Sequence, residues 1–178
     1  MREEREHRVG NVNALMDKDR SELVMCRSAT ETQALAKRLA GEIPDGAIVC
    51  LHGNLGTGKT CFVQGLARGL GIRRAVGSPT FTLVNEYRGT RGLAHIDLYR
   101  IRGAADAFSL GLEDYLQYFP GVVAIEWAER AAELLPEDCW HVWLMEGESD
   151  ECRVVKVSRP LLERIKAPPK PTAGNAKK

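Results

Sequence analysis

Short apolar runs and segments of helical periodicity alternate along the chain. The runs at 47–51 and 122–125 contain no charged residue, which is typical of parallel strands covered on both faces. Further strands are predicted at 23–26, 81–87, 93–98, 141–145 and 153–157. Helices are predicted at 29–41, 104–119 and 128–135, and a further helix begins after the loop that follows residue 51 and ends at about 69–71. This alternation predicts one α/β domain with a mostly parallel sheet, helices on both faces and an antiparallel hairpin.

Capping and turn residues indicate where these elements begin and end. Residues 28–31 read Ser-Ala-Thr-Glu, the capping-box pattern that starts a helix. Gly111 predicts a break in the segment 104–119, and the glycines of 88–92 predict a hairpin turn. The last two strands are expected to form a terminal hairpin.

Length and composition are those of an ordinary folded domain. Of the 178 residues, 44% are hydrophobic and 28% are charged. Residues 1–22 are charged and aperiodic and 166–178 are rich in Lys and Pro, so we predict disordered tails around a domain at 23–165. The apolar runs are too short for a membrane span and the first residues include no apolar signal region, so we expect a cytoplasmic protein without membrane contact.

Cysteine and histidine spacing does not indicate a metal site. The five cysteines include no C-x-x-C pair, so neither a disulfide framework nor a zinc site is predicted. The four histidines, His95 among them, lack metal-ligand spacing. We interpret them as surface or packing residues.

A glycine-rich loop follows the strand at 47–51. Its residues match the pattern G-x-x-x-x-G-K-[ST] in full: Gly53, Asn54, Leu55, Gly56, Thr57, Gly58, Lys59 and Thr60. Such a loop turns backbone N–H groups toward phosphate oxygens, and the following helix points its positive end at the same anion. Lys59 is placed to bridge the β- and γ-phosphates, and the Thr60 hydroxyl to ligate Mg²⁺. We therefore predict a P-loop NTPase-like domain that binds a nucleoside triphosphate.

Two acids at the ends of predicted strands are candidates for the second group directed at Mg²⁺. Glu126 follows the run at 122–125, and Asp97 follows Leu93-Ala94-His95-Ile96. A carboxylate at a strand end can ligate the metal, hold its waters or orient an attacking water. An exposed acid without such a role is the alternative for each. Trp127 follows Glu126 at the strand end, where open α/β sheets place their ligands.

A threonine downstream of the loop is a candidate switch residue. Thr80 lies twenty residues after Thr60, in the sequence Ser78-Pro79-Thr80. A hydroxyl on such a segment can reach the γ-phosphate side of Mg²⁺, as a switch threonine does. A plain Ser-Pro turn is the alternative interpretation.

Charge is distributed in blocks although the formal net charge is only +1. Residues 68–102 contain seven arginines and two acids, residues 103–151 contain twelve acids and one base, and residues 153–178 contain eight bases and one acid. A solvated surface explains these blocks as well as a basic face for nucleic acid or an acidic partner does. No RNA-binding motif with interleaved aromatics is present, so direct contact with RNA is not indicated.

Five sequence blocks occur in an order that resembles one bacterial family. They are the loop at 53–60, SPTFTLVNEY at 78–87, HIDLYR at 95–100, GLEDY at 111–115 and IEW at 125–127. The series resembles the TsaE (YjeE) family, the ATPase component of the bacterial tRNA threonylcarbamoyladenosine machinery, over residues 28–158. The resemblance implies a small P-loop fold that binds ATP and Mg²⁺. It also implies a Mg²⁺-dependent ATPase, weak alone, that acts with the TsaB and TsaD subunits on the adenine 3′ to the tRNA anticodon and contacts tRNA through their complex.

The resemblance also implies roles for individual residues. Thr60 and Glu126 match the Mg²⁺ site, and Asp97 matches an acid needed for activity. Thr80 lies in the switch-like segment, residues 78–87, and Thr32 matches a position near the adenine end of the nucleotide.

Two residues in the loop region depart from the family pattern. Asn54 stands where the family usually has Asp, and Cys61 where it usually has Thr or Ser. The first removes a negative charge beside the triphosphate but leaves the backbone cradle intact. An effect on affinity or rate is therefore expected, and loss of the site is not.

The loop alone leaves the reaction open, because kinases and ATPases share it. A small-molecule kinase would need an acceptor site and a lid with arginines; Arg73, Arg74, Arg100 and Arg102 could supply the lid, but no acceptor motif is visible. A nucleotide-gated interaction module, in which ATP orders 78–87 for a partner, is a third possibility. A GTPase is disfavoured because no N-K-x-D segment occurs.

Overall fold

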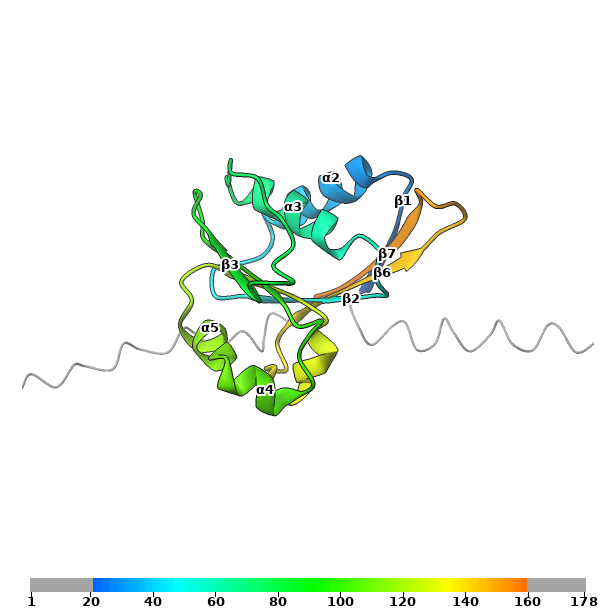
Figure 1. Cartoon of the computed structure of the whole chain (residues 1–178). Coiled ribbons are helices and arrows are strands. Elements are labelled where there is room, and N and C mark those ends of the chain that lie inside the picture. Colours follow the sequence, from blue (N-terminus) through cyan, green and yellow to red (C-terminus); the bar gives the residue numbers. More distant parts are fainter. Residues whose placement is uncertain (1–20, 160–178) are drawn as a thin grey trace, which may run out of the picture.

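A computed structural model describes residues 21–159, which form a seven-stranded sheet with helices on both faces (Figure 1). The strands are β1 (Ser21–Cys26), β2 (Ile48–His52), β3 (Val84–Tyr87), β4 (Leu93–Asp97), β5 (Val122–Glu126), β6 (Trp140–Glu146) and β7 (Arg153–Ser158). The helices are α2 (Ala29–Leu39), α3 (Lys59–Gly69), α4 (Ala104–Ser109), α5 (Leu112–Tyr118) and the 3₁₀ helix η1 (Ala128–Leu134). The predicted α/β fold is confirmed.

The sheet is parallel in its centre and antiparallel at its edges. In the order β1-β7-β6-β2-β5-β4-β3, strands β6, β2, β5 and β4 are parallel neighbours. Strand β3 pairs antiparallel with β4, and β6, β7 and β1 continue antiparallel at the other edge. Both predicted hairpins are therefore present. Because β2, β5 and β4 are parallel, their carboxyl ends lie side by side at the same end of the sheet, where α/β proteins bind ligands.

Two apolar layers explain why the central strands contain no alternating polar residues. Val49 and Leu51 of β2 face the layer of α2 and α3, whereas Ile48 and Cys50 face the layer of α4, α5 and η1. Figure 1 shows α2 and α3 on one side of the sheet and α4 and α5 on the other. Gly65 brings α3 close to α2, because a Cβ there would lie 2.3 Å from the carbonyl oxygen of Gln33.

The capping and turn signals of the sequence coincide with the element ends. The Ser28 hydroxyl accepts the N–H of Glu31, and the Glu31 carboxylate accepts the N–H of Arg27 rather than that of Ser28. The reciprocal bond of the capping box is thus shifted by one residue. Gly111 has φ 75° and separates α4 from α5, as predicted.

Some boundaries differ from the sequence predictions. Strand β3 begins at Val84 and not at residue 81, because Leu83 has φ 65° and its N–H donates to the Pro79 carbonyl in a turn. Strand β1 begins at Ser21, two residues before the predicted domain start. The tails predicted at 1–22 and 166–178 lie outside the described residues, apart from Ser21 and Glu22. Across residues 21–159, no helix has the length and apolar character needed to cross a membrane.

Candidate functional site

The glycine-rich loop joins β2 to the N-terminus of α3 through left-handed backbone. Gly53, Gly56 and Gly58 have φ values of 138°, 82° and 96°, which L side chains rarely adopt. A Cβ on Gly53 would also lie 2.4 Å from the carbonyl oxygen of Leu144. Glycine at this position therefore lets the loop pass close to β6.

Lys59, the first residue of α3, folds back over the loop. Its Nζ donates to the carbonyl oxygens of Gly53 and Asn54 at 2.6 and 2.8 Å, and lies 4.0 Å from the ring centroid of Trp127. The residue is 4% exposed, and burial lowers the pKa of its ammonium group, an effect that Glu126 partly opposes. Trp127 has φ 59°, so it ends β5 in a sharp turn that places its ring beside Lys59.

Thr60 and Glu126 are joined directly. The Thr60 hydroxyl donates to Oε1 of Glu126 at 2.7 Å, which links the N-terminus of α3 to the end of β5. His95 of β4 contacts the same oxygen through Nε2 at 2.8 Å. Glu126 is 4% exposed, so this carboxylate is held in place by its neighbours and screened from bulk solvent.

Asp97, at the end of β4, organises the segment that follows α3. Its Oδ2 accepts hydrogen bonds from the hydroxyls of Thr80 (2.5 Å) and Ser78 (3.3 Å). Its Oδ1 accepts the N–H of Tyr99 at 2.9 Å. The Ser78–Thr80 segment is thereby held against the end of β4 beside the loop.

One cavity of about 330 Å³ brings most of the predicted residues together. Its lining comes from the loop, the switch-like segment and the ends of β4 and β5: Leu55, Gly56, Gly58, Lys59, Thr60, Ser78, Thr80, Asp97, Tyr99, Glu126 and Trp127. Neither Asp97 nor Glu126 is the freely exposed strand-end acid considered as an alternative, since they are 3% and 4% exposed.

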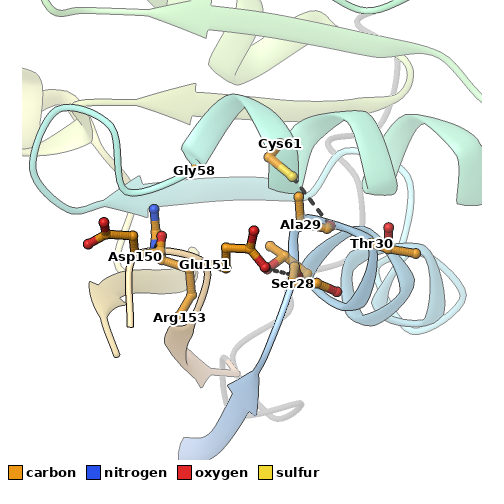
Figure 2. Close-up of a pocket in the computed structure, with 9 residues that line it drawn as sticks. Ser28, Ala29, Thr30, Gly58, Cys61, Asp150, Glu151 and Arg153 are labelled. Carbon is orange, nitrogen blue, oxygen red and sulfur yellow. Dashed lines mark hydrogen bonds between the residues drawn. The ribbon is translucent and has the colours of Figure 1, made fainter. Parts of the chain in front are cut away.

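A second cavity, of about 440 Å³, lies at the other side of the loop (Figure 2). Figure 2 shows Ser28, Ala29 and Thr30 of the α2 N-terminus opposite Asp150, Glu151 and Arg153 of the β6–β7 hairpin. Thr32, the predicted residue near the adenine end, also lines this cavity and is 1% exposed. Its hydroxyl donates to the Ser28 carbonyl at 3.3 Å. Gly58 lines both cavities, so a single extended molecule on the loop could reach the two.

Two residues at the site, His95 and Arg153, were not predicted from the sequence. His95 is fully buried, as a packing residue is, but it also contacts Glu126, which the spacing of the histidines did not indicate. Arg153 supports the loop from β7, because its guanidinium donates to the carbonyls of Thr57 (2.9 Å) and Gly56 (3.2 Å). His95 lies two residues before Asp97 in the same strand, so the period of two places both side chains on one face and could have indicated it. Arg153 lies 93 residues after Thr60 and had no local signal.

The residues present fit a triphosphate with its cation. Lys59 supplies a buried positive charge, which donates to two backbone carbonyl oxygens. The Thr60 hydroxyl donates its proton to Glu126, so the lone pairs of its oxygen are free to ligate Mg²⁺. Among residues 21–159, no group of three or more His, Cys, Asp or Glu side chains forms a metal cage. Mg²⁺ is usually bound by one or two protein groups together with substrate phosphates, which agrees with this donor set.

Fold and loop together define a P-loop NTPase-like α/β protein. The family model described as "Threonylcarbamoyl adenosine biosynthesis protein TsaE" matches residues 26–155. The chain therefore belongs to the TsaE family, and the resemblance seen in its five sequence blocks is confirmed.

Individual relatives agree with this assignment. A protein of Treponema pallidum (strain Nichols) named "tRNA threonylcarbamoyladenosine biosynthesis protein TsaE" is 45% identical over 111 residues, 62% of this chain and 82% of its own length. The protein of that name from Bacillus subtilis (strain 168) is 41% identical over 122 residues, 68% of this chain and 75% of its own length. A structure titled "Crystal structure of Bacillus subtilus YdiB" superposes with a TM-score of 0.69 and 33% identity, over 80% of this chain and 88% of that one.

Proposed function

We propose that this protein is the ATP-binding and ATP-hydrolysing subunit of tRNA threonylcarbamoyladenosine biosynthesis. In this proposal it acts with TsaB and TsaD subunits and reaches tRNA through their complex. The observation that carries the proposal is the convergence of Lys59, the Thr60–Glu126 pair and Asp97 on one cavity beside the glycine-rich loop. Membership of the TsaE family supplies the reaction to which this site is assigned.

The loop and Lys59 form the binding half of the site. The left-handed glycines turn backbone N–H groups toward an anion, and α3 adds the partial positive charge of its N-terminus. Lys59 exchanges its two carbonyl acceptors for phosphate oxygens, which the position of its ammonium group beside the loop allows. Thr32 and its surroundings in the second cavity are assigned to the adenine end.

The carboxylates form the chemical half of the site. Mg²⁺, when bound, neutralises charge on the phosphates and polarises the bond to be broken. Thr60 and Glu126 are assigned to hold it, through a hydroxyl lone pair and a carboxylate oxygen. Asp97 is assigned to orient the attacking water, and its hydrogen bonds to Thr80 and Ser78 make the switch-like segment responsive to what occupies the cavity.

ATP turnover under three conditions tests the proposal against its alternatives. The protein is assayed alone, with candidate small-molecule acceptors, and with TsaB, TsaD and tRNA. We expect slow hydrolysis alone, no effect of acceptors, and faster turnover with the partners. A phosphorylated acceptor would support a small-molecule kinase, whereas ATP binding and partner association without hydrolysis would support a nucleotide-gated interaction module.

A further inference from the structure

His95 is a fully buried polar residue next to Glu126, which is assigned to hold Mg²⁺. It lies on β4 with 0% of its surface exposed and is paired in register with Ala124 of β5. Two residues further along both strands, Asp97 is paired with Glu126. Because side chains two residues apart share a face of a strand, His95 lies one layer beneath the two acids, on the same face.

The two ring nitrogens of His95 have different surroundings. Nε2 lies 2.8 Å from Oε1 of Glu126, whereas Nδ1 is buried without a hydrogen-bond partner. A proton on Nδ1 would be a buried donor with no acceptor, which is unfavourable. The proton in this contact therefore lies on Nε2, which donates it to Oε1 of Glu126.

The two donors to Glu126 converge on one of its oxygens. Thr60 Oγ1 donates to Oε1 at 2.7 Å, and His95 Nε2 donates to the same Oε1. A carboxylate held by one oxygen in this way cannot rotate freely about its Cγ–Cδ bond. The other oxygen, Oε2, is left to accept a cation.

We propose that His95 is a positioning residue that fixes the Glu126 carboxylate for a divalent cation. The inference rests on the proposed function, because the cation concerned is the one that accompanies ATP. His95 acts through Glu126 and touches neither nucleotide nor cation. Carboxylates that ligate metals are commonly held by a further hydrogen bond, and removal of that partner typically lowers metal affinity 10- to 100-fold.

Two substitutions separate the hydrogen bond from the packing of the ring. His95→Leu fills the site without a donor, and His95→Gln keeps an N–H that can reach Glu126. The control is His52→Leu, because His52 also contacts a glutamate, Glu129 at 3.3 Å, but does not line the cavity. Each protein is titrated with a fluorescent ATP analogue, first without Mg²⁺ and then with increasing Mg²⁺.

We expect equal affinity for the analogue without Mg²⁺ in all four proteins. With Mg²⁺, His95→Leu should need about 10- to 100-fold more cation for half-maximal tightening, while His95→Gln and His52→Leu stay within a few-fold of the wild type. A wild-type response to Mg²⁺ in His95→Leu would overturn the proposal. Failure of the wild type itself to respond to Mg²⁺ would instead contradict the proposed function, and this inference with it.

The ring proton of His95 gives a second readout that needs no variant. Long-range ¹H–¹⁵N correlation spectra of the nucleotide-free wild type should show the Nε2–H form for this ring. A proton on Nδ1 instead would overturn the proposal. This measurement decides the question if His95→Leu does not fold.

Discussion

Lys59 is the residue on which nucleotide affinity depends most, because it is the cation held beside the loop carbonyls. Replacing Lys59 with Ala removes a charge-assisted hydrogen bond of about 1.5–3 kcal/mol, which corresponds to roughly a 10- to 150-fold loss of affinity. Titration with a fluorescent ATP analogue measures this loss. Lys37→Ala is the control, since Lys37 is exposed on α2 and lines neither cavity. Equal affinity in the two variants would contradict the assignment of the loop.

Burial of Lys59 also predicts a dependence of affinity on pH. Burial lowers the pKa of the ammonium group below its ordinary value of 10.5, and the protonated form is the one that binds phosphate. As pH rises through this lowered pKa, the proton is lost and affinity for the ATP analogue should fall. Lys59→Arg stays protonated, so its affinity should change less between pH 7 and 10. Identical pH profiles would show that Lys59 is not the group responsible.

The acids should separate binding from chemistry. Asp97 and Glu126 are assigned to the water and the cation, so replacing either with Ala should leave nucleotide bound and slow hydrolysis at least about tenfold. Single-turnover assays with TsaB and TsaD present measure the chemical step. Glu133→Ala, on the exposed side of η1, should keep the wild-type rate. Wild-type rates in both test variants would leave the two carboxylates without a catalytic role.

Residue types and local spacing were enough to predict most of the residues that line the cavity, but not the residues that hold that lining in place. The loop is contiguous in sequence, and Asp97 and Glu126 are recognisable because each comes directly after apolar residues at the end of a strand. His95 shares a strand face with Asp97, which is a local signal, but its contact with Glu126 requires the pairing of β4 with β5. The contact of Arg153 with the loop requires the return of β7. Contacts of this kind depend on topology, which the pattern of a single sequence does not specify.

The conformation of the glycine-rich loop depends on glycines with positive φ. Gly53→Ala places a Cβ 2.4 Å from the Leu144 carbonyl oxygen and 2.7 Å from the Thr57 hydroxyl, whereas Gly56→Ala meets nothing within 4 Å. Gly56→Ala should therefore cost only the left-handed backbone penalty of about 1–2 kcal/mol. Gly53→Ala should cost more and displace the loop from β6. Thermal unfolding of both variants measures the difference, and an equal or smaller fall in Tm for Gly53→Ala would show that the close approach to β6 is not required.

At the level of elements, the sequence predicted those parts whose signals are local. The break between α4 and α5 followed from Gly111, and the buried strands from their apolar runs. The start of β3 was predicted wrongly because residues 81–83 have strand-like composition, yet the segment is held in a turn by the Pro79 carbonyl and by Asp97. A tertiary contact overrides propensity at that point.

For the whole molecule, the exposed switch-like segment predicts an association that depends on nucleotide. Phe81 is 84% exposed, with the Arg100 guanidinium 4.4 Å from its ring centroid, one residue after Thr80 at the cavity. If TsaB–TsaD favours the ATP-bound arrangement of this segment, binding of TsaB–TsaD raises the affinity for ATP. ATP must then raise the affinity for TsaB–TsaD by the same factor. Phe81→Ala should then weaken association while leaving ATP affinity unchanged. Calorimetric titrations with and without ATP test this, and unchanged association would place the contact elsewhere.

Salt should affect the same association. Arg73, Arg74, Arg88 and Arg102 of the basic block are exposed, so any attraction they exert on a partner is screened as ionic strength rises. Arg91 is already paired with Asp45 at 2.6 Å and should contribute less. We expect weaker association at higher salt. An association independent of salt would leave the basic block as a solvated surface.

The measurement that tests the central claim most directly is threonylcarbamoyl transfer to tRNA over many turnovers. TsaB, TsaD and tRNA are supplied with the threonylcarbamoyl donor and ATP, and this protein is present, absent, or replaced by Lys59→Ala. We predict sustained product formation only with the wild-type protein, because the cavity beside Lys59 is assigned to the ATP cycle that supports turnover. Equal amounts of product in all three reactions would contradict the proposed function.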